Sequence, residues 1–142
     1  MRVGIGYDSH RFVAGRPLVV GGVDVVFDKG LEGWSDADAL THALIDALCG
    51  AAGLQDIGTL FPPGDERFRN APGLQLLCTV MRYLGDKGLR VVNADTVVIA
   101  ERPVLAPYLE EMRTRLADVL GIASADASIK PKTAESMGSL GR

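Results

Sequence analysis

The clearest hydrophobic pattern in the chain lies between residues 35 and 56. Apolar side chains recur there at the spacing of a helix, which predicts an amphipathic helix that packs one stripe against a core. Ser35 is expected to be the N-cap, and the helix is expected to end near Gly53. The stripe consists of Leu40, Leu44, Ala47, Leu48 and Ala51.

The opposite face of this predicted helix carries Asp38, His42 and Asp46, which are spaced four residues apart. Side chains at that spacing lie almost on one line along a helix. Either aspartate is therefore placed to accept a hydrogen bond from the His42 imidazole and to fix its tautomer. The alternative is that Asp38 only stabilises the start of the helix and that Asp46 is a solvated acid.

The rest of the chain alternates between strand-like and helix-like patterns. The spacing of leucine and methionine predicts two further helices, over residues 74–87 and 107–120. A proline-rich loop over residues 54–73 joins the first two helices, and loops of this length in a small domain are often functional. Strands are predicted over residues 2–7, 18–20, 23–27, 89–100 and 127–130.

Interspersed strands and helices indicate an α/β or α+β arrangement in which helices cover a sheet. A chain of 142 residues is most simply one domain. Its net charge of −3 argues against a general nucleic-acid-binding protein, and no membrane-spanning segment or secretory signal is visible. Cys49 and Cys78 fall within predicted helices and are expected to be reduced thiols, as in a cytoplasmic protein.

The chain contains two histidines, and both have carboxylates nearby. Asp8 and His10 follow the first predicted strand and would point to the same side of it, because side chains two apart in a strand do so. Together with His42 they offer one carboxylate and two imidazoles, a set that suits a zinc-type ion and leaves a fourth position open. The alternative, equally supported by these residues alone, is an exposed His10 and a His42 that only satisfies a polar helix face.

Three loop regions carry groups that suit phosphate. Lysine, threonine and backbone amides bind phosphate oxygens, and a glutamate can hold a Mg²⁺ ion that bridges phosphates. Taken one at a time, ordinary surface turns are the commoner explanation. The regions are Ser35-Asp36, residues 56–58 with 61–65, and residues 132–135 with Arg142.

These features also form one ordered series of motifs along the chain. The series is Gly4–Phe12, Gly21-Gly22, Lys29–Gly33, Ser35–Ala52, Asp56–Pro62, Val97–Met112 and Lys130–Gly138. In its residues and spacing it resembles the 2-C-methyl-D-erythritol 2,4-cyclodiphosphate synthase family of the non-mevalonate isoprenoid pathway. The resemblance covers essentially the whole chain, so it is far more specific than any single motif.

The resemblance implies an α+β fold (an α/β sandwich), with a mixed β-sheet covered by helices on one face. It implies a single domain that assembles as a homotrimer with shared active sites, without a nucleic-acid or membrane partner. The implied enzyme is a phosphorus–oxygen lyase with a small cytidine diphosphate substrate, 4-diphosphocytidyl-2-C-methyl-D-erythritol 2-phosphate. The 2-phosphate attacks the β-phosphorus of the same molecule, which gives the 2,4-cyclodiphosphate and releases CMP.

The resemblance also implies roles for individual residues. Asp8, His10 and His42 match the zinc ligands, and Glu135 matches a residue that holds Mg²⁺ or Mn²⁺ between the diphosphate oxygens. Thr133 matches a residue that helps to stabilise the transition state. The implied substrate-binding residues are Asp8, Ser9, His10, Trp34, Ser35, Asp56, Ile57, Gly58, Phe61, Pro62, Pro63, Gly64, Asp65, Ala100, Glu101, Arg102, Pro103, Val104, Leu105, Ala106, Lys132, Thr133, Ala134, Glu135, Ser139 and Arg142.

The sequence departs from the family pattern at three places. Trp34 stands where the family has a histidine near the reacting phosphates, so it is a catalytic residue by position only, with one indole N–H to donate. Ser139 replaces an aromatic residue. Residues 1–142 are expected to form a cyclodiphosphate synthase-like domain that lacks the family's C-terminal strand.

These departures leave two alternatives to the cyclase. The first is a catalytically impaired trimer of the same family that still binds cytidine nucleotides. The second is a metal-dependent phosphohydrolase, which would release inorganic phosphate in place of a cyclic product.

Overall fold

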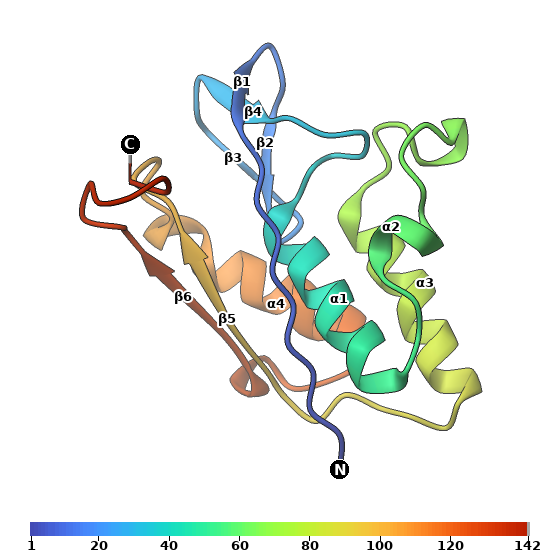
Figure 1. The fold of residues 1–142 in the computed structure, drawn as a ribbon. Coiled ribbons are helices and arrows are strands. Elements are labelled where there is room, and N and C mark those ends of the chain that lie inside the picture. Colours follow the sequence, from blue (N-terminus) through green and yellow to red (C-terminus); the bar gives the residue numbers. More distant parts are fainter. Residues whose placement is uncertain (142) are drawn as a thin grey trace.

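The computed structural model describes residues 1–141, and Figure 1 shows its fold. Short strands precede the central helices, and two longer strands lie in the last third of the chain. The helices are α1 (Ala39–Ala52), α2 (Ile57–Leu60), α3 (Gly73–Asp86) and α4 (Leu109–Leu120). The strands are β1 (Phe12–Ala14), β2 (Leu18–Val20), β3 (Val23–Val25), β4 (Lys29–Leu31), β5 (Ala94–Ile99) and β6 (Ala127–Lys132).

Within the described residues, each strand forms backbone hydrogen bonds with one other strand. β1 with β4 and β2 with β3 are antiparallel, whereas β5 and β6 are parallel, with Ala94 opposite Ala127 and Ile99 opposite Lys132. The α+β class is confirmed, but within residues 1–141 the backbone hydrogen bonds define three two-stranded sheets and not the single sheet that was expected. Helices α1, α3 and α4 lie together on one side of β5 and β6, as expected for helices covering one face (Figure 1).

Helix α1 lies in the middle of the core. Leu40 and Leu44 are buried as predicted, but Ile45 and Cys49 on other sides of the helix are buried as well. The reason is that α3, β2 and β5 all pack against α1. A pattern with one apolar stripe therefore underestimates how much of this helix is enclosed.

The start of α1 differs from the prediction, because its N-cap is Asp38 and not Ser35. The fully buried Asp38 carboxylate accepts a hydrogen bond from the backbone N–H of Thr41 at 3.0 Å. It also accepts hydrogen bonds from the N–H groups of Gly21 at 2.9 Å and Gly22 at 2.7 Å, in the turn between β2 and β3. One side chain thus joins the beginning of the helix to a distant turn.

The N-terminal segment, predicted as a strand over residues 2–7, pairs with no other strand among residues 1–141. It runs extended along α1 (Figure 1), with Gly4 and Gly6 against the helix backbone. A Cβ atom on Gly4 would lie 1.8 Å from the carbonyl oxygen of Ala47, so only glycine fits. Val3 and Ile5, on the opposite side, are 86% and 93% exposed. The alternation that suggested a strand therefore reflects glycines that face a helix.

The remaining boundaries differ in smaller ways. The strand predicted over residues 89–100 forms only at β5, whereas the one predicted over 127–130 extends to Lys132 because it pairs with β5 along its whole length. Lys29 and Gly30, which lie outside every predicted strand, are part of β4. Helices α3 and α4 begin and end within two residues of the predicted positions. Across residues 1–141, none of the helices has the length and apolar character needed to cross a membrane.

Both cysteines are free, as expected, but they differ in access to solvent. Cys49 is 1% exposed, and burial, with the charges of Asp46 and Asp56, raises the pKa of its thiol to about 11. Because the thiolate is the reactive form, iodoacetamide at pH 8 is expected to label the exposed Cys78 and to leave Cys49 unlabelled in the folded protein. Peptide mass spectrometry measures this, with Cys78→Ser as the control that takes no label. Labelling of Cys49 before Cys78 would contradict the buried position.

Candidate functional site

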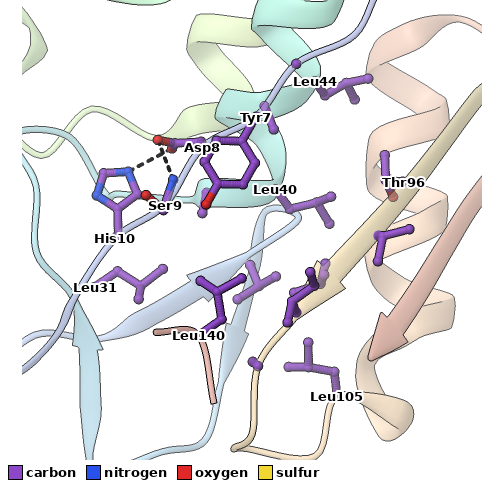
Figure 2. A pocket seen from close by; sticks show the side chains of 18 of the residues that line it. Tyr7, Asp8, Ser9, His10, Leu31, Leu40, Leu44, Thr96, Leu105 and Leu140 are labelled. Carbon is purple, nitrogen blue, oxygen red and sulfur yellow. Dashed lines mark hydrogen bonds and ion pairs between the residues drawn. The ribbon is translucent and has the colours of Figure 1, made fainter. Parts of the chain in front are cut away.

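The extended N-terminal segment and α1 bring Asp8, His10 and His42 together. One ligand atom from each of these residues lies within 4.8 Å of the other two. The Asp8 Oδ2 atom is 2.8 Å from His10 Nε2 and 3.2 Å from His42 Nδ1. Figure 2 shows the contact between Asp8 and His10. The predicted grouping of the three residues is thus confirmed. The alternative, in which His10 is exposed and His42 only satisfies a polar helix face, does not agree with these contacts.

The backbone fixes which nitrogen of His10 faces the cluster. Its Nδ1 lies 2.6 Å from the carbonyl oxygen of Glu32, which can only accept a hydrogen bond. Nδ1 is therefore a protonated nitrogen. Nε2 is the nitrogen that faces Asp8, and it donates to the carboxylate when the ring is protonated and offers a lone pair to a cation when the ring is neutral.

His42 faces the cluster through its other nitrogen. Its Nε2 lies 3.2 Å from Ser35 Oγ, while its Nδ1 faces Asp8. The prediction that Asp38 or Asp46 holds this imidazole is wrong. Asp38 is the N-cap, and the Asp46 carboxylate accepts a hydrogen bond from the backbone N–H of Ile57 at 2.8 Å.

The three residues fit a divalent cation. Zinc is bound by imidazole nitrogen and carboxylate oxygen at about 2.0–2.2 Å, so neighbouring ligand atoms in a tetrahedral site lie roughly 3.3 Å apart. The separations of 2.8 and 3.2 Å around Asp8 Oδ2 are close to that value. Each imidazole also has its second nitrogen occupied by an oxygen atom, which is the usual arrangement of metal-binding histidines.

The electrostatics agree with this arrangement. Burial alone would raise the pKa of Asp8, but the hydrogen bonds from His10 and His42 outweigh it and hold the pKa well below its usual range. The hydrogen bond to Asp8 in turn raises the pKa of His10. Asp8 is therefore a carboxylate near neutral pH, which is the form that binds a cation.

Beside this cluster lies a cavity of about 480 Å³. Asp8, Ser9 and His10 are among the residues that line it. Four more of the predicted substrate-binding residues also line it, namely Ala100, Arg102, Pro103 and Leu105. Figure 2 shows Tyr7, Leu40, Leu44, Thr96 and Leu140 around the same space. Sequence reasoning had assigned Leu40 and Leu44 to the core only, because an apolar stripe does not distinguish a core from a cavity wall.

Trp34 is fixed to the loop that follows α2. Its indole N–H donates to the carbonyl oxygen of Asp65 at 2.9 Å, and the guanidinium of Arg69 lies 4.2 Å from the centre of its ring. Its own carbonyl oxygen accepts from the N–H of Asn70 at 2.8 Å. The single donor expected of Trp34 is therefore already used within the protein.

The predicted loop over residues 56–65 is thus connected to the cluster through Trp34 and Ser35. Asp56 is the N-cap of α2, and Ile57 and Gly58 form the first two positions of that helix. Phe61 is buried and packs against the ring of Phe68. The predicted residues left exposed in this loop are Asp56, Gly58, Pro62, Pro63 and Gly64.

The predicted residues near the end of the chain form hydrogen bonds with one another and with Glu101. The N–H of Ala134 donates to the Glu101 carboxylate at 2.8 Å, and the Thr133 hydroxyl donates to Glu135. Within residues 1–141, no hydrogen bond links this segment to Asp8, His10 or His42. The remaining predicted residues are Lys132, Val104, Ala106 and Ser139, all exposed, and Arg142, which lies outside the described residues.

Comparison with known proteins gives concordant matches. The model of the YgbB family matches residues 1–142. Two curated relatives are named 2-C-methyl-D-erythritol 2,4-cyclodiphosphate synthase and align with 100% of this chain. The protein of Symbiobacterium thermophilum is 54% identical, with 90% of its own length covered, and that of Moorella thermoacetica is 51% identical, with 87% covered.

Solved structures agree with these matches. The bifunctional IspDF of Campylobacter jejuni superposes with a TM-score of 0.94 at 37% identity, over 99% of this chain and 38% of that one. A 2C-methyl-D-erythritol-2,4-cyclodiphosphate synthase solved with CDP gives a TM-score of 0.89 at 36% identity, over 94% of this chain and 89% of that one.

Proposed function

Because the chain belongs to the YgbB family, we propose that it is a 2-C-methyl-D-erythritol 2,4-cyclodiphosphate synthase, a lyase of isoprenoid precursor biosynthesis. It converts 4-diphosphocytidyl-2-C-methyl-D-erythritol 2-phosphate to the cyclic diphosphate and CMP. The observation that carries this proposal is the cluster of Asp8, His10 and His42 beside a cavity of about 480 Å³. Relatives named as this synthase, and a structure of one with CDP, support the same activity.

The reaction joins two groups of one molecule. An oxygen of the 2-phosphate bonds to the β-phosphorus while the bond from that phosphorus to the bridging oxygen breaks, and CMP leaves with that oxygen. Since the reacting groups are already tethered, the protein has to fold the substrate and offset the repulsion between two anionic phosphates. No protein nucleophile is needed, which agrees with the inert character of Cys49.

Asp8, His10 and His42 would hold zinc or a similar divalent cation. When bound, that cation supplies positive charge to the phosphate oxygens. The Asp8 carboxylate, His10 Nε2 and His42 Nδ1 are the groups that would hold this charge in place. We assign Glu135 to a second cation, Mg²⁺ or Mn²⁺, and Thr133 and Lys132 to donation toward phosphate oxygens.

We propose that the active form is a homotrimer with sites shared between subunits. In one chain, the segment from Lys132 to Glu135 is hydrogen-bonded to Glu101 and Ala100, and not to the histidine cluster. Two apolar side chains close in sequence to Glu101 and Glu135 are exposed to solvent. Val104 is 74% exposed and Met137 is 68% exposed. A neighbouring subunit would cover these apolar side chains and bring its own Lys132–Glu135 segment to the cluster.

We infer that Trp34 has a structural role here and does not take over the role of the family's histidine near the reacting phosphates. Its indole N–H and its carbonyl oxygen both bind the loop between residues 65 and 70. This would hold the loop beside Ser35 and the phosphates. The side chain thus gives no support to the alternative of an impaired enzyme.

We also place the enzyme in the cytoplasm. Cys49 and Cys78 are both free thiols, and reducing compartments keep thiols in that state.

The direct test is to incubate the protein with the cytidyl substrate, Zn²⁺ and Mg²⁺. CMP and a cyclic diphosphate are expected in equal amounts, and removal of metal by a chelator is expected to lower the rate at least about tenfold. Phosphorus NMR distinguishes the products. Inorganic phosphate would favour the phosphohydrolase, and nucleotide binding without turnover would favour the impaired trimer.

A further inference from the structure

We propose that Ser35 is a positioning residue for His42. When Nδ1 binds the cation, Nε2 carries the ring proton, and the hydroxyl oxygen of Ser35 accepts a hydrogen bond from it and so holds the imidazole in the orientation that presents Nδ1. This role rests on the cation assigned above and differs from a contact with substrate.

The contact between these two side chains is the only hydrogen bond formed by His42 Nε2 within residues 1–141. The distance from Ser35 Oγ to Nε2 is 3.2 Å. The nearest carboxylate oxygen, Oδ1 of Asp36, is 3.8 Å away, too far for a hydrogen bond. The Asp36 oxygens already accept from the N–H groups of Asp38 and Gly73. Since His42 is 6% exposed, water has little access to replace the serine.

Ser35 is itself held firmly. Its Oγ accepts a hydrogen bond from the N–H of Ala37 at 3.2 Å. The Arg16 guanidinium donates to the carbonyl oxygens of Gly33 and Ser35, one on each side of Trp34. The hydroxyl oxygen is therefore placed by the backbone on both sides of the residue, and it can set the direction of the imidazole.

Each histidine is held by a hydrogen bond at the ring nitrogen that faces away from Asp8, but the partner is a different kind of group in the two cases. His10 is fixed by the backbone carbonyl of Glu32, which is present whatever side chain stands at position 32. His42 depends on the side chain of Ser35. Substitution of one residue thus tests the orientation of one ligand without removing any ligand.

We expect Ser35→Ala to weaken zinc binding about 10- to 100-fold, as loss of an outer partner of a metal-bound histidine does. Competition with a chromophoric chelator measures the affinity. Ser35→Thr keeps the hydroxyl and should stay within about threefold of the original protein, and Ser124→Ala, an exposed serine on another segment, should not change the affinity. The melting temperature of each metal-free variant shows whether folding is affected.

A second measurement does not depend on affinity. In zinc-loaded protein with ¹⁵N-labelled histidine, long-range correlation spectra should show His42 protonated at Nε2 and metal-bound at Nδ1. The inference is overturned if Ser35→Ala binds zinc as tightly as the original protein, or if the metal is found on Nε2. If the original protein binds zinc and releases CMP in either case, the proposed function stands. If it binds no metal, both proposals fail.

Discussion

Replacement of His42 with alanine is expected to weaken zinc binding at least about a hundredfold and to stop the release of CMP. Structural zinc sites with four ligands are worth roughly 10–16 kcal/mol, or about 3 kcal/mol for each ligand. A loss of about 3 kcal/mol raises the Kd more than a hundredfold. The effect should exceed that of Ser35→Ala, because a ligand is removed and not only turned.

Two measurements are needed for His42→Ala, namely zinc affinity by chelator competition and CMP release at saturating substrate. Gln75→Ala, on the exposed side of α3, is the control and should match the original protein in both. Circular dichroism of the metal-free variant shows whether α1 is intact. Tight zinc binding by His42→Ala would contradict the assignment of this histidine as a ligand.

Replacement of Asp38 with alanine is expected to destabilise the folded protein by about 3–5 kcal/mol. The carboxylate accepts hydrogen bonds from the N–H groups of Gly21, Gly22 and Thr41 and from the Thr41 hydroxyl, at 2.6–3.0 Å. Each buried donor that loses its acceptor costs about 1–3 kcal/mol. Since small domains are stable by only about 5–15 kcal/mol, this is one of the largest single losses available in the chain.

Urea unfolding followed by circular dichroism measures this loss. Asp118→Ala, an exposed acid on α4, is the matched control and should change the free energy of unfolding by less than about 0.5 kcal/mol. Asp38→Asn should also be destabilised, because an amide places N–H groups against backbone donors. A variant of Asp38 as stable as the original protein would show that this carboxylate does not hold the turn to the helix.

The cluster of Asp8, His10 and His42 was predictable because short-range patterns define its members. The Asp8-x-His10 motif and a histidine in an amphipathic helix are visible without any knowledge of the fold. The partner of His42 was not visible, since Ser35 precedes the helix and reaches the imidazole only because the helix begins later than predicted. Both Ser35 and Asp38 are good N-caps by local criteria.

A contact distant in sequence decides between those two caps. Asp38 also binds the turn at Gly21 and Gly22, and no local pattern reports that pairing. The N-terminal strand was mispredicted for the same reason, because alternation cannot reveal that Gly4 and Gly6 face a helix. The roles given to residues 100–106 and 132–135 came from the family resemblance, since their own patterns are those of ordinary turns.

The way the N-terminal segment lies on α1 has a thermodynamic consequence. Two of the three proposed cation ligands belong to a segment held without strand pairing within residues 1–141, and the third belongs to the central helix. A cation that joins them cross-links the first ten residues to the core, so occupancy and folding are linked equilibria. The added stability is RT ln(1 + [L]/Kd), about 2.7 kcal/mol when the free ion is at a hundred times its Kd. If the proposed cation binds, the melting temperature of a preparation would rise with the fraction of protein that carries the cation.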